Sequence, residues 1–107
     1  MKDYYHPNKS RVKDWTLNDF LRNSISGNLQ EVPGIGSLSV KILGNAGIST
    51  TFQLIGKYLV LKEDGCGPFE HADRFYFWLK HVGITQHTAS IVHCIGEKNE
   101  YWFCWYL

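Results

Sequence analysis

The chain has 107 residues, of which 44% are hydrophobic and 20% charged, as is typical of one folded domain and not of a disordered chain. Its net charge is +1, so it lacks the strongly basic composition, with a pI above about 9, that marks many nucleic-acid-binding domains. The three cysteines form no CxxC pair, and no apolar run resembles a signal peptide or a membrane span. We therefore expect reduced thiols in an intracellular protein, nuclear or cytoplasmic, that has no membrane partner.

The first 14 residues are polar and carry the cations Lys2, Lys9, Arg11 and Lys13. This composition predicts a flexible or loosely docked N-terminal arm, followed by a single helical domain over residues 15–107. The cations of the arm would add phosphate contacts, or the arm would simply be a solvated tail.

The first helix is expected to follow Thr16, which forms a capping-box pattern with Asp19, and to end near Ser24 or Ser26. Trp15, just before the cap, would pack back onto this helix as a hydrophobic staple. A short helical turn then leads to Pro33, where it must stop because a residue before proline avoids the helical region.

Residues 32–36, with the sequence VPGIG, are the most informative stretch of the chain. Gly34 and Gly36 permit a tight turn whose N–H groups can approach another molecule closely. A helical pattern follows from Ser37 to about Asn45, and Gly47 provides its C-terminal cap. The first N–H groups of that helix have no partner within it, and its dipole is positive at this end, so the turn favours phosphate. Residues 29–47 therefore predict a helix-hairpin-helix motif, which binds the backbone of a nucleic acid.

Three further helices are expected in the second half of the chain. One begins at a capping box formed by Thr50 and Gln53 and runs toward Lys62. After a loop that contains glycine and proline, helical spacing of apolar residues predicts a helix over residues 69–82, and Thr85 would cap a last one. Because no strands alternate convincingly, we predict an all-α, compact bundle of about five helices.

From Gly34 onward the sequence resembles barrier-to-autointegration factor, a family of small chromatin proteins that bridge double-stranded DNA. The likeness extends over about residues 29–82, with an insertion near residues 65–73. It implies a compact all-helical fold and sequence-independent binding of double-stranded DNA by a homodimer. The matching residues are Gly34, Ile35, Gly36, Lys41, Leu43, Gly47 and the run LIGKYLVLK at 54–62.

The hairpin and the resemblance together predict the residues that contact DNA. Backbone amides of the turn and of the helix after it would face the phosphates, and lysines would add electrostatic attraction. The predicted DNA-binding residues are Gly34, Ile35, Gly36, Ser37, Leu38, Ser39, Lys41, Lys57 and Lys62.

A second interpretation is a helical protein-interaction module, related to SAM-like domains, that keeps the hairpin only as a structural turn. The aromatic tail YWFCWYL at residues 101–107 would then be a surface for a protein partner or a dimer seam, since such side chains are enriched at interfaces. Alternatively, the tail folds back and completes a small core.

No catalytic, metal or cofactor site is predicted, so we expect a protein that is not an enzyme. Gly56 and Lys57 are followed by Tyr58 and not preceded by the glycine of a GxxxxGK motif, so they form no P-loop. The histidines and cysteines match no common zinc spacing. These residues are His71, His81, His87, His93, Cys66 and Cys94.

Overall fold

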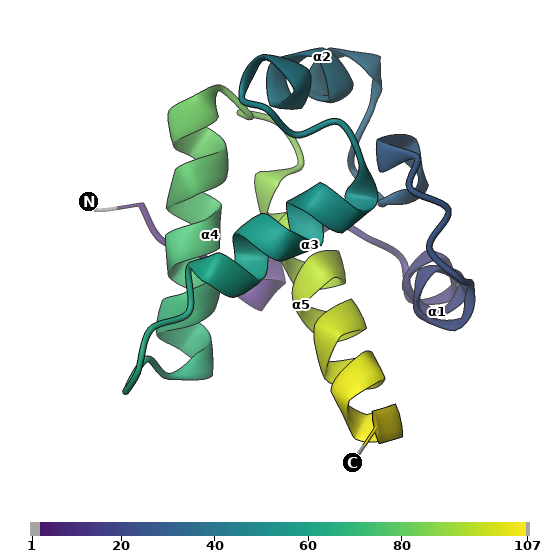
Figure 1. Ribbon diagram of the computed structural model, residues 1–107, viewed down its shortest axis with the longest axis vertical. Coiled ribbons are helices and arrows are strands. Elements are labelled where there is room, and N and C mark those ends of the chain that lie inside the picture. The colour runs from purple at the N-terminus through teal and green to yellow at the C-terminus, as the bar shows by residue number, and fades with distance from the viewer. Residues whose placement is uncertain (1–2, 107) are drawn as a thin grey trace.

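The computed structural model describes the backbone of residues 3–106 and the side chains of residues 3–100, and this part of the chain is helical with no strand (Figure 1). The predicted all-α fold of about five helices is confirmed. The elements are the 3₁₀ helix η1 (Pro7–Lys9), α1 (Asp14–Arg22), the 3₁₀ helix η2 (Leu29–Glu31), α2 (Ser37–Asn45), α3 (Thr51–Val60), α4 (Pro68–Val82) and α5 (Thr88–Tyr106).

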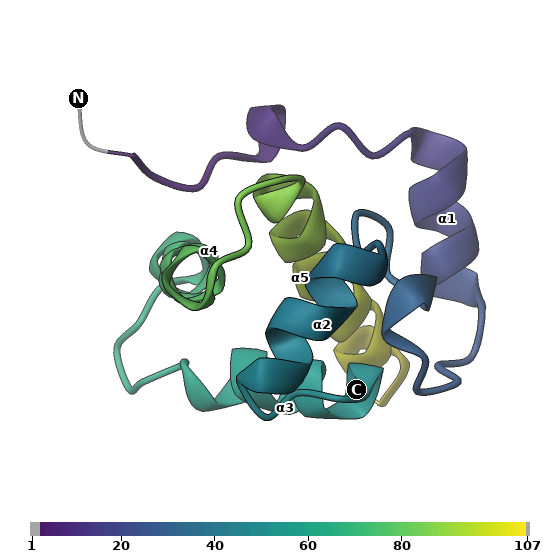
Figure 2. The same ribbon diagram turned by 90° about the horizontal axis from the view of Figure 1, so that it is seen from above.

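Helix α5 lies at the centre of the molecule, and α1, α3, α4 and η1 pack around it (Figures 1 and 2). From Ala89 to Val92 every side chain of α5 is buried, and Cys94 and Ile95 are buried as well. A helix that is covered on several sides needs apolar residues on more than one face, and Ala89, Ile91, Val92, Cys94 and Ile95 provide them.

Local sequence signals fix the start of α3 and the end of α2. The predicted capping box at the start of α3 is confirmed, because the Thr50 side chain accepts from the Gln53 N–H and the Gln53 side chain accepts from the Thr50 N–H. Helix α2 ends as predicted: Gly47 takes a φ of 87°, and the Ile48 N–H donates to the Leu43 carbonyl at 2.8 Å.

Helix α1 differs from the prediction at both ends. It begins at Asp14 with no side-chain cap, so the expected capping box at Thr16 does not form. Trp15 is 65% exposed and does not form the predicted hydrophobic staple. It ends at Arg22, where the ammonium of Lys98 in α5 donates hydrogen bonds to carbonyl oxygens at the C-terminal end of α1. This interaction joins segments far apart in the sequence, which explains why local patterns do not reveal it.

Helix α5 begins at Thr88 and not at the predicted Thr85. The turn before it contains His87 at a φ of 59°, a left-handed conformation that interrupts the helical path. The Thr88 hydroxyl donates to the Ile84 carbonyl at 3.1 Å and so closes this turn.

The described part of the N-terminal segment lies along α4 and α5, where a flexible or loosely docked arm was expected (Figure 2). Tyr5 is buried, and its N–H donates to Asp73 Oδ1 of α4 at 2.8 Å. The Arg11 N–H donates to Ser90 Oγ of α5 at 2.9 Å. The donors in these contacts are backbone N–H groups, so the polar side chains of the segment give no indication that it docks.

The side chains of the aromatic tail at residues 101–107 are outside the described part of the structure, so the packing expected of them stays a prediction. Among the helices of the described residues, none combines the length and the apolar character that crossing a membrane requires.

Lys98 is 1% exposed, and its ammonium donates to three carbonyls, those of Phe20 at 2.7 Å, Leu21 at 2.9 Å and Asn23 at 2.6 Å. Burial lowers the pKa of this ammonium, while the charge of Glu31 acts in the opposite direction. The hydrogen bonds stabilise the charge and satisfy the C-terminal end of α1.

We therefore predict that Lys98→Met lowers the free energy of unfolding by about 2 kcal/mol, because carbonyls at the end of α1 lose their donor. Lys41→Met, on the exposed face of α2, should change it by less than about 0.5 kcal/mol. Urea denaturation followed by circular dichroism measures both. Equal stabilities of the two variants would show that the ammonium does not hold the end of α1.

Candidate nucleic-acid interface

The predicted hairpin residues form a tight turn between η2 and α2. The Ile35 N–H donates to the Val32 carbonyl at 3.1 Å, and Gly34 takes a φ of 100°. Val32 and Ile35 are buried in the core, whereas Gly36 is exposed. The two apolar side chains thus anchor the turn and leave its outer backbone accessible.

Glu31 fastens the first part of this turn to its surroundings. Its carboxylate accepts from the Ser26 N–H at 2.9 Å, the Gly27 N–H at 3.0 Å and the Thr51 hydroxyl at 2.6 Å. Partial burial opposes ionisation, but these hydrogen bonds outweigh it and lower the pKa of Glu31. An ionised Glu31 therefore ties η2 to the preceding loop and to the start of α3.

On its other side, the turn packs closely against the beginning of α5. A Cβ atom at Gly34 would lie 3.2 Å from both His87 Cβ and Ile91 Cγ1, so only glycine fits without displacement. This close approach holds the hairpin against the turn between α4 and α5.

A groove of about 730 Å³ runs between these elements. One wall is the hairpin with the first turn of α2, the second is the N-terminal segment at residues 11–13, and the third is the turn at residues 83–87. Six predicted residues line it together, whereas Lys41, Lys57 and Lys62 do not. The six are Gly34, Ile35, Gly36, Ser37, Leu38 and Ser39.

The start of α2 gives this groove its electropositive character. Gly36 occupies the N-cap position and supplies no side-chain hydrogen bond, and the first turn contains no acidic residue. The N–H groups of Ser37, Leu38 and Ser39 are the first of the helix and have no acceptor within it. They therefore add hydrogen-bond donors to the positive end of the helix dipole.

Arg11, Lys13 and His87 also line the groove, and they are absent from the predicted site. Arg11 and Lys13 belong to the N-terminal run of cations, which was the one signal in the sequence that pointed to them. Their position beside the hairpin follows from docking of that segment on α5. Lys57 instead lies on α3, with its Nζ 5.2 Å from the centre of the Trp78 ring.

Other titratable groups serve packing. Burial raises the pKa of the Cys94 thiol to about 12, with Glu97 adding to the effect, so the thiol stays protonated. His71 Nε2 lies 2.6 Å from the Tyr58 carbonyl, and the two rings stack. No group of three or more His, Cys, Asp or Glu side chains among the described residues is placed to hold a metal ion.

Comparisons of the chain with protein-family models, with curated proteins and with solved structures give no match.

The two glycines of the turn should respond differently to the same substitution. Gly34→Ser should lower the free energy of unfolding by about 1–3 kcal/mol, because the new side chain meets His87 and Ile91 at a positive φ. Gly36→Ser should leave it unchanged or raise it by a few tenths of a kcal/mol, since no atom lies within 4 Å of the new Cβ and serine is a favourable N-cap. Thermal and urea denaturation provide the comparison, and a Gly34→Ser variant as stable as the wild type would contradict the close approach.

Proposed function

We propose that this chain is a non-enzymatic protein that binds double-stranded DNA without sequence preference, by holding the phosphate backbone in the groove beside its hairpin. The observation that carries the proposal is the uncapped start of α2, which lies in one groove with Arg11 and Lys13. Backbone donors and cations that converge in one concave site are the groups that phosphate recognition requires.

The proposed contact divides into two parts. The N–H groups at the start of α2 donate to phosphate oxygens and set the position of the backbone in the groove. The side chains of Arg11 and Lys13 supply attraction that depends on salt, because each phosphate they neutralise releases counterions. Neither part reads a base edge, so the affinity should be alike for unrelated duplexes.

The resemblance to barrier-to-autointegration factor supports the same proposal. The stretch that carries this likeness includes the hairpin at residues 34–36, which forms one wall of the groove. A homodimer and a nuclear location belong to the proposal through that resemblance alone.

A second candidate is a SAM-like module for protein interaction. Leu38 lines the groove and is 69% exposed, and Trp15 in the nearby helix α1 is also largely exposed. Exposed apolar side chains of this size favour contact with a protein partner. In that case the groove would bind an apolar side chain, and DNA would bind only weakly even at low salt.

The first test uses Gly36, where a new side chain meets no neighbour. In Gly36→Asp, the new carboxylate should accept hydrogen bonds from the amides at the start of α2. The stability of α2 should therefore stay the same or rise, while a negative charge occupies the proposed phosphate site. We predict that the affinity for a fluorescent duplex of about 24 base pairs falls by about tenfold or more at low salt.

Fluorescence anisotropy over a series of salt concentrations measures this effect. Gly36→Asn is the matched control, because it caps the helix without the charge and should lose less affinity. Two duplexes of unrelated sequence test the lack of specificity. Binding by Gly36→Asp equal to that of the wild type would disprove phosphate contact at this end of α2, and no binding by the wild type at low salt would favour the protein-interaction module.

A second test identifies the cations. Arg11→Gln with Lys13→Gln, and Lys57→Gln with Lys62→Gln, remove the same net charge from the chain. We predict that the first pair weakens binding more and reduces the slope of log affinity against log salt by about two, one for each lost phosphate contact. The second pair should cause the smaller, general loss that accompanies lower net charge. A larger loss in the second pair would move the DNA path away from the groove and toward α3.

A further inference from the structure

A second hollow, of about 420 Å³, adjoins the groove on the far side of the turn between α4 and α5. Arg11, His87 and Ser90 line both cavities, together with Thr85 and Gln86. The two hollows are therefore neighbours that share this turn as a wall.

The second hollow is rich in cations. Lys9 comes from η1, Arg11 from the N-terminal segment and Lys80 from α4, and none of the lining residues is aspartate or glutamate. Tyr76 adds a hydroxyl donor, whereas the hydroxyl of Thr88 in the same wall donates to the Ile84 carbonyl. Such a set of donors with no acidic residue among them fits an anion.

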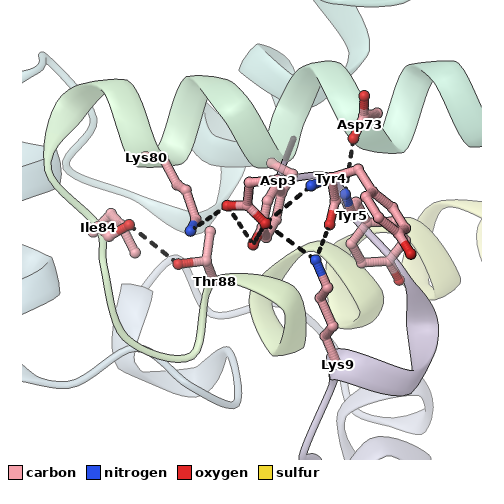
Figure 3. Close-up of polar contacts among 9 residues, drawn as sticks. Asp3, Tyr4, Tyr5, Lys9, Asp73, Lys80, Ile84 and Thr88 are labelled. Atoms are coloured by element: carbon pink, nitrogen blue, oxygen red, sulfur yellow. Dashed lines mark hydrogen bonds and ion pairs between the residues drawn. The ribbon is translucent and has the colours of Figure 1, made fainter. Parts of the chain in front are cut away.

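Three of these lining residues, Lys9, Lys80 and Tyr76, hold the carboxylate of Asp3, which does not itself line the hollow (Figure 3). It lies 2.6 Å from Lys80 Nζ and 3.1 Å from Lys9 Nζ. The Tyr76 hydroxyl donates to both of its oxygens at 3.2 Å, and the Tyr4 N–H donates to Oδ1 at 2.9 Å. Two ammonium groups and a hydroxyl around one pair of oxygens resemble the donors that surround a bound phosphate.

The contact is strongly polarised and nonetheless exchangeable. Hydrogen bonds from Lys80 and Lys9 hold the pKa of Asp3 well below its usual range, so its carboxylate remains charged at neutral pH. The side chains of Asp3 and Lys80 are 41% and 38% exposed, and ion pairs with that access to water contribute little to stability. An anion with more charge and more oxygens can therefore replace this carboxylate at small cost.

We propose that the donors Lys9, Lys80 and Tyr76 at the edge of this hollow form a second phosphate site, and that the Asp3 carboxylate pairs with them as an internal competitor. A phosphate group that enters the site displaces Asp3 and the start of the N-terminal segment. Where the phosphate belongs to DNA, the inference rests on the proposed function, and the backbone then continues from the hairpin groove across residues 85–87. Free phosphate is the other source with the same chemistry.

Asp3→Asn in the full chain tests the competition, with Asp73→Asn as the matched control. Asp73 also contacts the N-terminal segment, through the Tyr5 N–H, and the amide oxygen of asparagine can still accept that bond. Both substitutions remove one negative charge from the same region, but only Asp3 contacts the two lysines. We expect Asp3→Asn to raise the affinity for duplex DNA by about fivefold and to steepen the salt dependence by about one unit. Asp73→Asn should raise the affinity by less than about twofold.

Lys80→Gln, introduced into Asp3→Asn, should remove that gain because the site then lacks a principal donor. A separate arm uses inorganic phosphate and no DNA. In ¹H–¹⁵N NMR spectra, Asp3→Asn should show saturable shifts of the amides at residues 85–90. Neither Asp73→Asn nor the variant that combines Asp3→Asn with Lys80→Gln should show them.

The two arms separate this inference from the proposed function. A gain over Asp73→Asn in either arm that Lys80→Gln abolishes supports the site, and the arm in which it appears identifies the source of the phosphate. If the wild type binds DNA but Asp3→Asn behaves as Asp73→Asn in both arms, the second site is refuted and the proposed function stands. If no variant binds DNA while Asp3→Asn binds inorganic phosphate, the proposed function fails and the site remains.

Discussion

The burial of helix α5 is the constraint on which the rest of this structure depends. Helices α1, α3, α4 and η1 pack around it, and contacts with its side chains also hold the N-terminal segment and the hairpin. Lys98 ends helix α1, Ser90 holds the N-terminal segment, and Ile91 receives the close approach of Gly34 in the hairpin. Because these contacts point in different directions from one helix, α5 determines how the outer elements stand relative to one another. The groove lies near its N-terminal end, between the hairpin, residues 11–13 and the turn at residues 83–87.

The position of the hairpin leaves backbone groups at the start of α2 accessible in the groove. A turn with buried Val32 and Ile35 keeps its polar outer edge toward solvent. Ionised Glu31 fixes the start of this turn through hydrogen bonds from the Ser26 N–H and the Thr51 hydroxyl. The amides at the start of α2 are thus fixed in direction before any ligand arrives. Preorganised donors lose little entropy on binding, which favours a small site made of only a few groups.

The near-neutral composition does not prevent a basic surface. Of the acidic residues, Glu31 is turned toward internal donors and Asp3 is engaged by Lys9 and Lys80. Arg11 and Lys13 meet the hairpin only after the N-terminal segment docks. Net charge averages over the whole chain, whereas a ligand responds to the local field of a cleft.

The sequence by itself determined the features that depend on neighbours a few residues away. The bounds of α2, the capping box of Thr50 and Gln53, and the tight turn at Gly34 all follow from local backbone chemistry. The six hairpin residues of the groove were predictable for the same reason. Only the tertiary structure decided where α1 ends, how the N-terminal segment docks and which cations join the hairpin. Those features depend on buried donors and acceptors, which pair with the groups that tertiary packing brings close to them. Such partners can be far away in the sequence, so local patterns do not identify them.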